Sequence, residues 1–301
     1  MPPASEHRVV PGNILVATDF SSASAPAVAY ALSLARRLGS NLYFAHVVRP
    51  DTLHRGDPSE PGSSLDQAWR EGHHLTTDLL IAGDLRGITH KLLIAQGEIW
   101  EQLAAMVREN DIGLIVVGTH RRTGLKKMLL GSVAETIFRQ APCPVLTVGP
   151  DFDAGTIKDS GPRRILYATD LAPAATAASY AFLFARQYDA HLILLHVIQE
   201  TGGTGDSRLH KSQRLESAKA RLGELVTEQD GLAGDPELIV GFGTPVTRVL
   251  DVASEKKPDL IVLGVQQASG RPGRHVWATA SAIVRQSACP VLTVREPETT
   301  S

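Results

Sequence analysis

The sequence predicts an α/β protein built from two tandem copies of a five-stranded, parallel-sheet, Rossmann-like domain. Its 301 residues are the length of two average domains. Short, wholly apolar runs alternate with segments of helical periodicity, which is typical of a parallel sheet covered by helices on both faces. The second half also repeats the first, so we expect two copies of one fold.

The repeat consists of four segments that recur in the same order at offsets of 146 to 151 residues. The pairs are Ile14–Phe20 with Ile165–Leu171, Leu42–Val48 with Leu192–Ile198, Leu114–Gly118 with Leu260–Gly264, and Cys143–Val148 with Cys289–Val294. A segment rich in Pro, Gly and Asp separates the two copies. We therefore predict a first domain at residues 1–150, a linker at 151–162 and a second domain at 163–301.

Within the first half, Ile14–Ala17 predicts a buried strand, and Ser21 or Ser22 is expected to cap the helix that Gly39 ends. Further strands are expected at 42–48, 91–95, 112–117 and 145–148, and further helices at 65–82, 98–108 and 132–139. Parallel sheets bind ligands beyond the carboxyl ends of their strands, so we expect the ligand-binding residues in the segments that follow these strands.

Composition excludes several classes of function. Lys and Arg total 30 against 32 for Asp and Glu, so the net charge of −2 predicts binding to neither nucleic acid nor an anionic membrane. The apolar runs are strand-sized and too short to cross a membrane. Met1–Pro11 lacks the apolar core of a secretory signal, and we expect a cytoplasmic protein.

The segment from Gly118 to Ser132 is the most informative motif. It leaves a predicted strand, crosses a basic loop and enters a helix at Gly131. Glycines allow close approach of a backbone, and a helix start attracts anions, so the segment has the chemistry of a phosphate site. It carries no Walker lysine. Ser132 has two interpretations, because with Glu135 it also forms a capping box.

These motifs, repeated in the second half, resemble a tandem universal stress protein. The residues that carry the resemblance are Ile14–Ser21, Leu42–Val48, Gly118–Glu135 and Ala141–Val148, and the likeness covers nearly the whole chain. The resemblance implies an adenine nucleotide alpha hydrolase-like domain that is often dimeric through its last strand. It also implies ATP as the ligand, since a subset of the family binds ATP.

The ATP-binding pattern of the family is Gly, two residues, Gly, nine residues, then Gly followed by Ser or Thr. Gly118, Gly131 and Ser132 fill the first, third and hydroxyl places, whereas Arg121 stands at the second glycine. An arginine there either prevents the close backbone approach or offers its guanidinium to the phosphate oxygens. His120, in the same loop, is a further candidate for phosphate contact.

The resemblance extends to residues at other strand ends. It implies that Asp19 meets the ribose or a metal ion, that Val47 contacts adenine through its backbone, and that Val133 joins the phosphate loop. Ala17, at the same strand end as Asp19, belongs to this candidate site. The alternative for Asp19 is structural, because an aspartate after a strand can accept backbone N–H bonds in the following turn.

The second half departs further from this pattern. Asp170 and Gly264 persist, but Gln267, Trp277 and Ala278 replace the second glycine, the third glycine and the hydroxyl residue. We expect no ATP binding in the family's manner in this degenerate half.

Four other polar or reactive side chains are expected to be structural. His46 and His196 lie within apolar strands and favour hydrogen-bonded core positions over metal or catalytic roles. Cys143 and Cys289 precede the last strand of each half, and pairing of those strands across a pseudo-twofold axis would bring them near each other. Reduced, packed thiols are the expected state in the cytosol.

The leading hypothesis is a cytoplasmic stress-response protein that binds ATP, with or without Mg²⁺, in its first domain and signals through a protein partner. Pairing of the two domains within the chain is expected, and a homodimer of the chain is a further possible assembly. Hydrolysis, if any, should be slow, because the sequence shows no Walker lysine and no water-activating base. The alternative is an interaction scaffold in which both sites have decayed.

Overall fold

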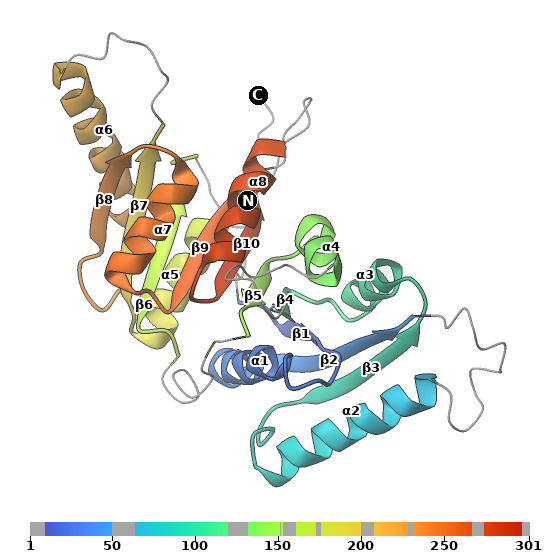
Figure 1. Cartoon of the computed structure of the whole chain (residues 1–301). Helices are drawn as coiled ribbons and strands as arrows, with labels where there is room; N and C mark the ends of the chain where they lie inside the picture. The colour runs from blue at the N-terminus through green and yellow to red at the C-terminus, as the bar shows by residue number, and fades with distance from the viewer. Residues whose placement is uncertain are drawn as a thin grey trace, which may run out of the picture.

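The computed structural model describes residues 10–49, 64–119, 132–150, 152, 161–172, 176–199, 208–227, 231–266 and 274–296. Strands and helices alternate through both halves (Figure 1). The strands are β1 (Asn13–Ala17), β2 (Asn41–Val48), β3 (His90–Gln96), β4 (Leu114–Gly118), β5 (Val145–Val148), β6 (Arg164–Thr169), β7 (His191–Ile198), β8 (Glu237–Phe242), β9 (Leu260–Gln266) and β10 (Val291–Glu296). The helices are α1 (Ala25–Leu38), α2 (Ser64–Ile81), α3 (Ile99–Glu109), α4 (Ser132–Gln140), α5 (Thr176–Tyr188), α6 (Arg208–Thr227), α7 (Pro245–Lys256) and α8 (Arg274–Gln286).

All ten strands form one continuous sheet in the order β3-β2-β1-β4-β5-β10-β9-β6-β7-β8. Each half contributes five parallel strands, as predicted, and the halves meet where β5 and β10 pair antiparallel, with Leu146 opposite Leu292. The expected pairing of the last strands within one chain is therefore confirmed. In the first half the chain reverses its direction of travel across the sheet between β1 and β4, which is where such sheets open a ligand crevice.

Alternate residues of each strand face opposite layers of helices. Ile14 and Val16 of β1 belong to the core under α1 and α2, whereas Leu15 belongs to the core under α3 and α4. The second half repeats this division, with α5 and α6 on one face and α7 and α8 on the other. Every central strand is covered on both faces, which is why its sequence is apolar throughout.

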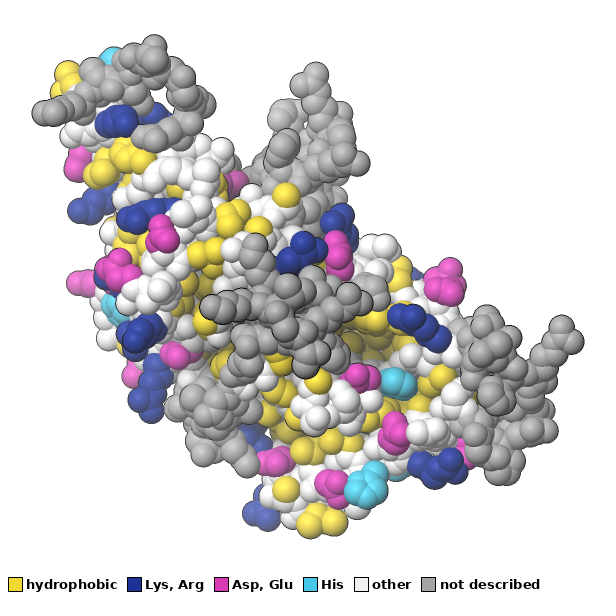
Figure 2. Space-filling model, in the orientation of Figure 1, with side chains coloured by type: hydrophobic (Ala, Val, Ile, Leu, Met, Phe, Trp, Pro, Cys, Tyr) yellow, Lys and Arg dark blue, Asp and Glu magenta, His cyan; other side chains and the backbone are white. Residues whose placement is uncertain are grey.

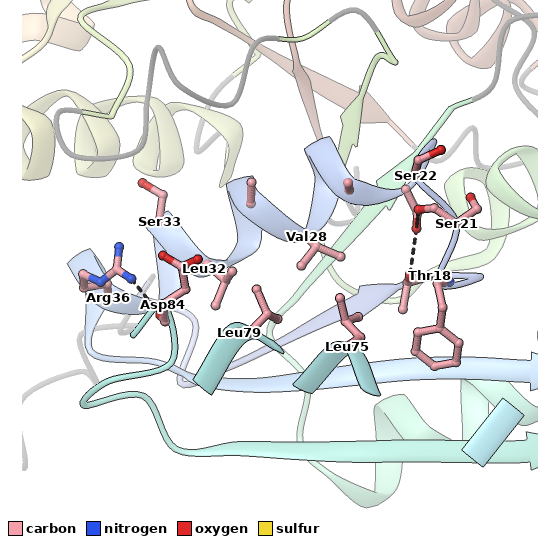
Figure 3. A pocket seen from close by; sticks show the side chains of 14 residues that line it. Thr18, Ser21, Ser22, Val28, Leu32, Ser33, Arg36, Leu75, Leu79 and Asp84 are labelled. Carbon is pink, nitrogen blue, oxygen red and sulfur yellow. Dashed lines mark hydrogen bonds between the residues drawn. The ribbon is translucent and has the colours of Figure 1, made fainter. Parts of the chain in front are cut away.

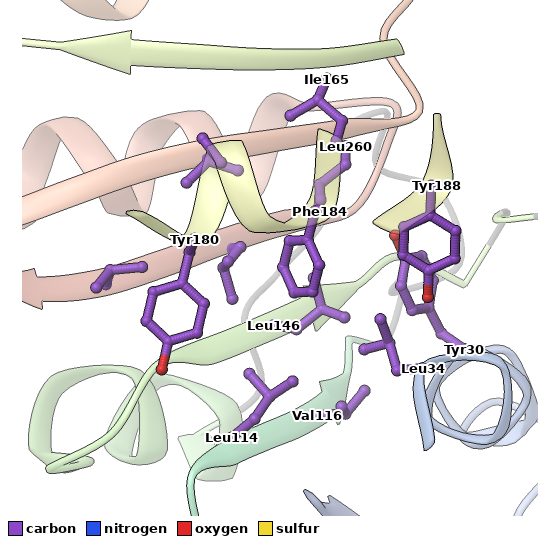
Figure 4. Close-up of a cluster of buried hydrophobic side chains, with 14 of the residues drawn as sticks. Tyr30, Leu34, Leu114, Val116, Leu146, Ile165, Tyr180, Phe184, Tyr188 and Leu260 are labelled. Carbon is purple, nitrogen blue, oxygen red and sulfur yellow. The ribbon is translucent and has the colours of Figure 1, made fainter. Parts of the chain in front are cut away.

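The two halves share a hydrophobic core in addition to their sheet. Figure 4 shows Phe184 and Tyr188 of α5 lying against Tyr30 of α1 and Leu146 of β5. The Arg37 guanidinium lies 5.8 Å from the centre of the Tyr188 ring. On the opposite face, the carboxylate of Glu135 on α4 lies 3.3 Å from the guanidinium of Arg285 on α8.

The start of α1 differs from the prediction. The helix begins at Ala25 with Ser24 in the N-cap position, so the expectation of a cap at Ser21 or Ser22 is wrong. The residues before Ser24 form a turn, and Ser24 Oγ donates to the carbonyl oxygen of Ser21 at 2.9 Å. Gly39 ends the helix in the left-handed conformation at φ 67°, as predicted.

The two cysteines are free thiols that lie apart. Val145 pairs with Thr293 and Thr147 pairs with Val291, so Cys143 precedes one end of the paired segment and Cys289 precedes the other. The expectation that strand pairing brings the cysteines together is wrong, because antiparallel pairing places equivalent residues of the two strands at opposite ends.

None of the helices in the described part of the chain is both long enough and apolar enough to cross a membrane. On the face drawn in Figure 2, basic and acidic side chains of the described residues are interspersed. This mixed distribution agrees with the small net charge of −2.

Candidate functional site

A cavity of about 290 Å³ opens at the carboxyl ends of the central strands of the first half. Five of the predicted site residues line it, namely Ala17, Asp19, Val47, Gly118 and Val133. They come from β1 or the turn after it, β2, β4 and α4, which are brought together by the parallel order of the sheet. Side chains of Ile99, Leu103 and Ala134 supply its apolar wall.

The turn after β1 is held by its own side chains. Thr18 Oγ1 accepts the Phe20 N–H at 2.9 Å, and Asp19 Oδ1 accepts the Ser21 N–H at 3.1 Å and its hydroxyl at 2.6 Å. These bonds hold Phe20 at φ 59°, a left-handed conformation that a bulky residue adopts only when its surroundings enforce it. Asp19 therefore has the structural role foreseen as an alternative, and its exposed carboxylate also borders the cavity. Sequence reasoning missed Thr18. The signal was a threonine directly after a strand, because its hydroxyl can accept the N–H two residues further on and so start a turn.

His46 joins β2 to the same turn. Its Nδ1 lies 2.8 Å from the carbonyl oxygen of Thr18, and its ring centre lies 5.0 Å from that of Phe20. A carbonyl oxygen can only accept a hydrogen bond, so Nδ1 of His46 carries a proton and donates it to this contact. The hydrogen bond predicted for His46 is confirmed, but the ring is half-buried and borders the cavity instead of lying in the core.

The other end of the cavity is described only in part. Val133 and Ala134 in the first turn of α4 line it, whereas the side chain of Ser132 and all of His120, Arg121 and Gly131 lie outside the described residues. Among the described lining residues, Asp19 and His46 are the titratable ones. This part of the cavity accordingly fits an uncharged portion of a ligand, and cations for a phosphate would have to come from the loop at 120–131.

Gly118 lies at the boundary between these two ends. A Cβ atom placed there would lie 3.6 Å from the nearest atoms, in Ala27 and Ser24, which is ordinary van der Waals contact. The fold of the described residues therefore does not itself require glycine at this position.

The sequence profile of the universal stress protein family matches residues 12–149 and 161–295. This chain belongs to the universal stress protein family. Universal stress protein Rv2005c of Mycobacterium tuberculosis is 25% identical over 302 residues, covering 98% of this chain and 99% of the relative. Universal stress protein YxiE of Bacillus subtilis is 30% identical over 143 residues, covering 45% of this chain and 97% of the relative.

The solved structures support the same fold. The crystal structure of a universal stress protein from Archaeoglobus fulgidus matches with a TM-score of 0.68 at 19% identity, covering 95% of this chain and 97% of the other. At that identity the match shows the fold.

The second universal stress domain repeats the geometry of the first. Thr169 Oγ1 accepts the Leu171 N–H at 3.0 Å, Leu171 has φ 63°, and Asp170 Oδ1 accepts the Ala172 N–H at 3.0 Å. His196 Nδ1 lies 2.9 Å from the carbonyl oxygen of Thr169. The phosphate motif is degenerate in sequence here, yet a cavity of about 530 Å³ remains at the strand ends, bordered by Asp170, Glu296 and other residues.

A further cavity, of about 400 Å³, lies between α1 and α2 on the opposite face of the first domain (Figure 3). Val28 and Leu32 of α1 face Leu75 and Leu79 of α2 across it. At one end, Arg36 donates to the carbonyl oxygen of Asp84 at 2.7 Å. Sequence reasoning did not foresee this cavity, because it depends on the distance between two helices that are far apart in the chain.

Proposed function

We propose that this universal stress protein binds ATP, with or without Mg²⁺, at the cavity of its first domain and passes its nucleotide state to a protein partner. The observation that carries the proposal is the convergence of Asp19, Val47, Gly118 and Val133 on one cavity at the crossover between β1 and β4. Parallel sheets bind their ligands at this place. The apolar walls suit a base, and the N-terminus of α4 suits a phosphate.

The described residues favour a sensor over a catalyst. Asp19 accepts hydrogen bonds within its turn, and Nδ1 of His46 is held by the carbonyl oxygen of Thr18. The Asp19 carboxylate is engaged in its own turn, and the sequence carries no Walker lysine to stabilise the transferred phosphoryl group. We therefore expect hydrolysis of bound ATP to be slow or absent.

A cavity-filling variant tests the site. Val133 lines the first cavity, and Thr279, its equivalent at an offset of 146 residues, lines the second. In equilibrium dialysis with radiolabelled ATP, we expect Val133→Trp to lose binding by at least tenfold because the indole fills the cavity. Thr279→Trp, the matched control, should bind ATP as the unmodified chain does. Normal ATP binding by Val133→Trp would refute the assignment of the site.

The alternative, an interaction scaffold without nucleotide, is favoured by the continuous sheet and shared core, which hold the two halves together through protein contacts alone. Chromatography of small molecules released by denaturing the purified chain separates the two functions. A released adenine nucleotide supports the ATP proposal. Its absence, together with no binding at millimolar ATP, supports the scaffold.

A further inference from the structure

Glu296 is a buried carboxylate in the cavity of the second domain. It ends β10 with 7% of its surface exposed. Its Oε2 accepts the Thr176 N–H at 2.5 Å and its Oε1 accepts the Ala177 N–H at 2.9 Å, both in the first turn of α5. The equivalent residue of the first half is Pro150, and there the hydroxyl of Ser24 lies at the start of α1 instead. The second domain thus supplies its own anion to a helix start.

Gly264 makes room for this carboxylate. A Cβ atom at Gly264 would lie 2.7 Å from Oε1 of Glu296, which is closer than real Cβ contacts. A Cβ atom at Gly118 would lie 3.6 Å from its nearest neighbours, which is ordinary van der Waals contact. A side chain at position 264 would displace the Glu296 carboxylate from its contact with α5, which accounts for the glycine that survives in the degenerate motif. Its retention is explained without any phosphate in this half.

The described walls of this cavity combine negative charge with apolar surface. Asp170 and Glu296 supply two carboxylates, and the described lining includes no Lys or Arg. The apolar surface comes from Leu195, Val197, Val246, Val249, Leu263 and Ile283. Glu296 already neutralises the partial positive charge of the α5 terminus, so a phosphate would meet like charges at this end of the cavity. A carboxylate oxygen can accept more than one hydrogen bond, so the two amide bonds of Glu296 do not exclude a further donor.

We propose that the cavity of the second domain binds a phosphate-free organic amine with an apolar body, and that Glu296 sets this preference by occupying the place of an anion. The volume of about 530 Å³ lies within the range of small-molecule sites. An ammonium group would donate charge-assisted hydrogen bonds to the carboxylates of Glu296 and Asp170 while its body packs on the apolar wall. This inference does not rest on ATP binding in the first domain.

A pair of probes with one body and opposite charges tests the preference. Tryptamine and indole-3-acetate share an indole ring, and calorimetric titration of the full chain should show at least tenfold tighter binding of tryptamine. Thr279→Trp should abolish tryptamine binding by filling the cavity, whereas Val133→Trp should leave it intact. Equal binding of the two probes, or tryptamine binding that survives Thr279→Trp, would overturn the proposal.

Charge variants then assign the preference to its residues. Glu296→Gln and Asp170→Asn should each reduce the tryptamine preference by several-fold, and the amide introduced by Asp170→Asn keeps an oxygen to accept the Ala172 N–H. Glu255→Gln, which removes an exposed carboxylate on α7, is the matched control and should change nothing. If Glu296→Gln and Asp170→Asn both retain the full preference, these carboxylates do not set it. ATP binding by the first domain is measured separately, so failure of one proposal leaves the other standing.

Discussion

At the scale of single residues, burial governs the chemistry of the two thiols. Desolvation raises the pKa of Cys143 to about 12 and that of Cys289 to about 11, although a hydrogen bond with Ser287 opposes the shift at Cys289. A thiolate, not a thiol, is the reactive species. Both cysteines are therefore suited to packing and poorly suited to redox sensing at neutral pH.

The raised pKa values of the two thiols predict that both cysteines are modified slowly in the folded protein. With a thiol-specific disulfide reagent at pH 8, both cysteines should react at least tenfold more slowly in the native chain than in urea, because few thiolates form when the pKa lies above the pH. The absorbance of the released thiol reports the rate. Rapid reaction of either native cysteine would contradict the burial argument.

Gly161 shows a second effect at this scale, because the fold requires a residue without a side chain at this position. Gly161 has φ +64°, and a Cβ atom there would lie within the Tyr188 ring. Gly161→Ala should therefore lower the free energy of unfolding by about 2 kcal/mol or more, through backbone strain and displacement of Tyr188. Gly223→Ala is the matched control, because Gly223 lies in α6 with open space around it. This variant should raise the free energy of unfolding by roughly 0.5–1 kcal/mol. Urea denaturation measures both changes, and an unchanged midpoint for Gly161→Ala would refute the clash.

At the scale of elements, strand ends and helix starts act on each other. In each half a threonine and an aspartate hold the turn after the first strand, and a histidine from the next strand binds the carbonyl oxygen of that threonine. The second half adds the contact between β10 and α5 through Glu296. The two halves therefore share a turn but differ in what the adjoining helix start contacts.

The contact between β10 and α5 predicts a pH dependence. Burial raises the pKa of Glu296, outweighing the amide hydrogen bonds that lower it. A carboxyl group with a raised pKa binds its proton more tightly in the folded state, so its stabilising contribution is present below the unfolded pKa and is lost as pH rises through the folded pKa. Relative to Glu296→Gln, the unmodified chain should lose stability as pH rises from about 4 toward neutrality. Urea denaturation across that range checks the sign, and a relative gain would contradict it.

At the scale of the whole molecule, the two halves are joined through both their sheet and their hydrophobic core. The sheet runs unbroken through β5 and β10, and one hydrophobic core contains residues of both α1 and α5. An unpaired edge strand is open to association with other chains, and the antiparallel pair covers one such edge in each half. The tandem arrangement thus supplies within one chain the partner that each last strand needs.

This architecture predicts cooperative unfolding. Leu292→Ala removes a fully buried side chain from the strand pair and should lower the free energy of unfolding by roughly 2–5 kcal/mol. Because the core is shared, far-ultraviolet circular dichroism and tyrosine fluorescence should shift together in a single transition. Leu209→Ala, at a position 66% exposed on α6, is the control and should change stability by less than about 0.5 kcal/mol. Two separated transitions would show that the halves unfold independently.

The sequence predicted the two-fold repeat, the strands of the first half and, with the family resemblance, five candidate residues that line one cavity. Apolar runs and turn residues are local signals, and parallel strands necessarily bring their carboxyl ends to one edge, so Asp19, Val47 and Gly118 were predicted to meet. The start of α1 was misplaced because Thr18 and Asp19 use the following residues for a turn that no helical periodicity reveals.

Only the tertiary structure decided which distant side chains meet. The antiparallel register separates Cys143 from Cys289, and the end of β10 places Glu296 against α5, 120 residues earlier in the chain. Such contacts depend on strand register and on the spacing between layers, which a local sequence pattern does not encode. For that reason the sequence predicted a second domain that binds no ATP in the family's manner, but it did not reveal the buried carboxylate or the cavity, larger than the first, that the structure places there.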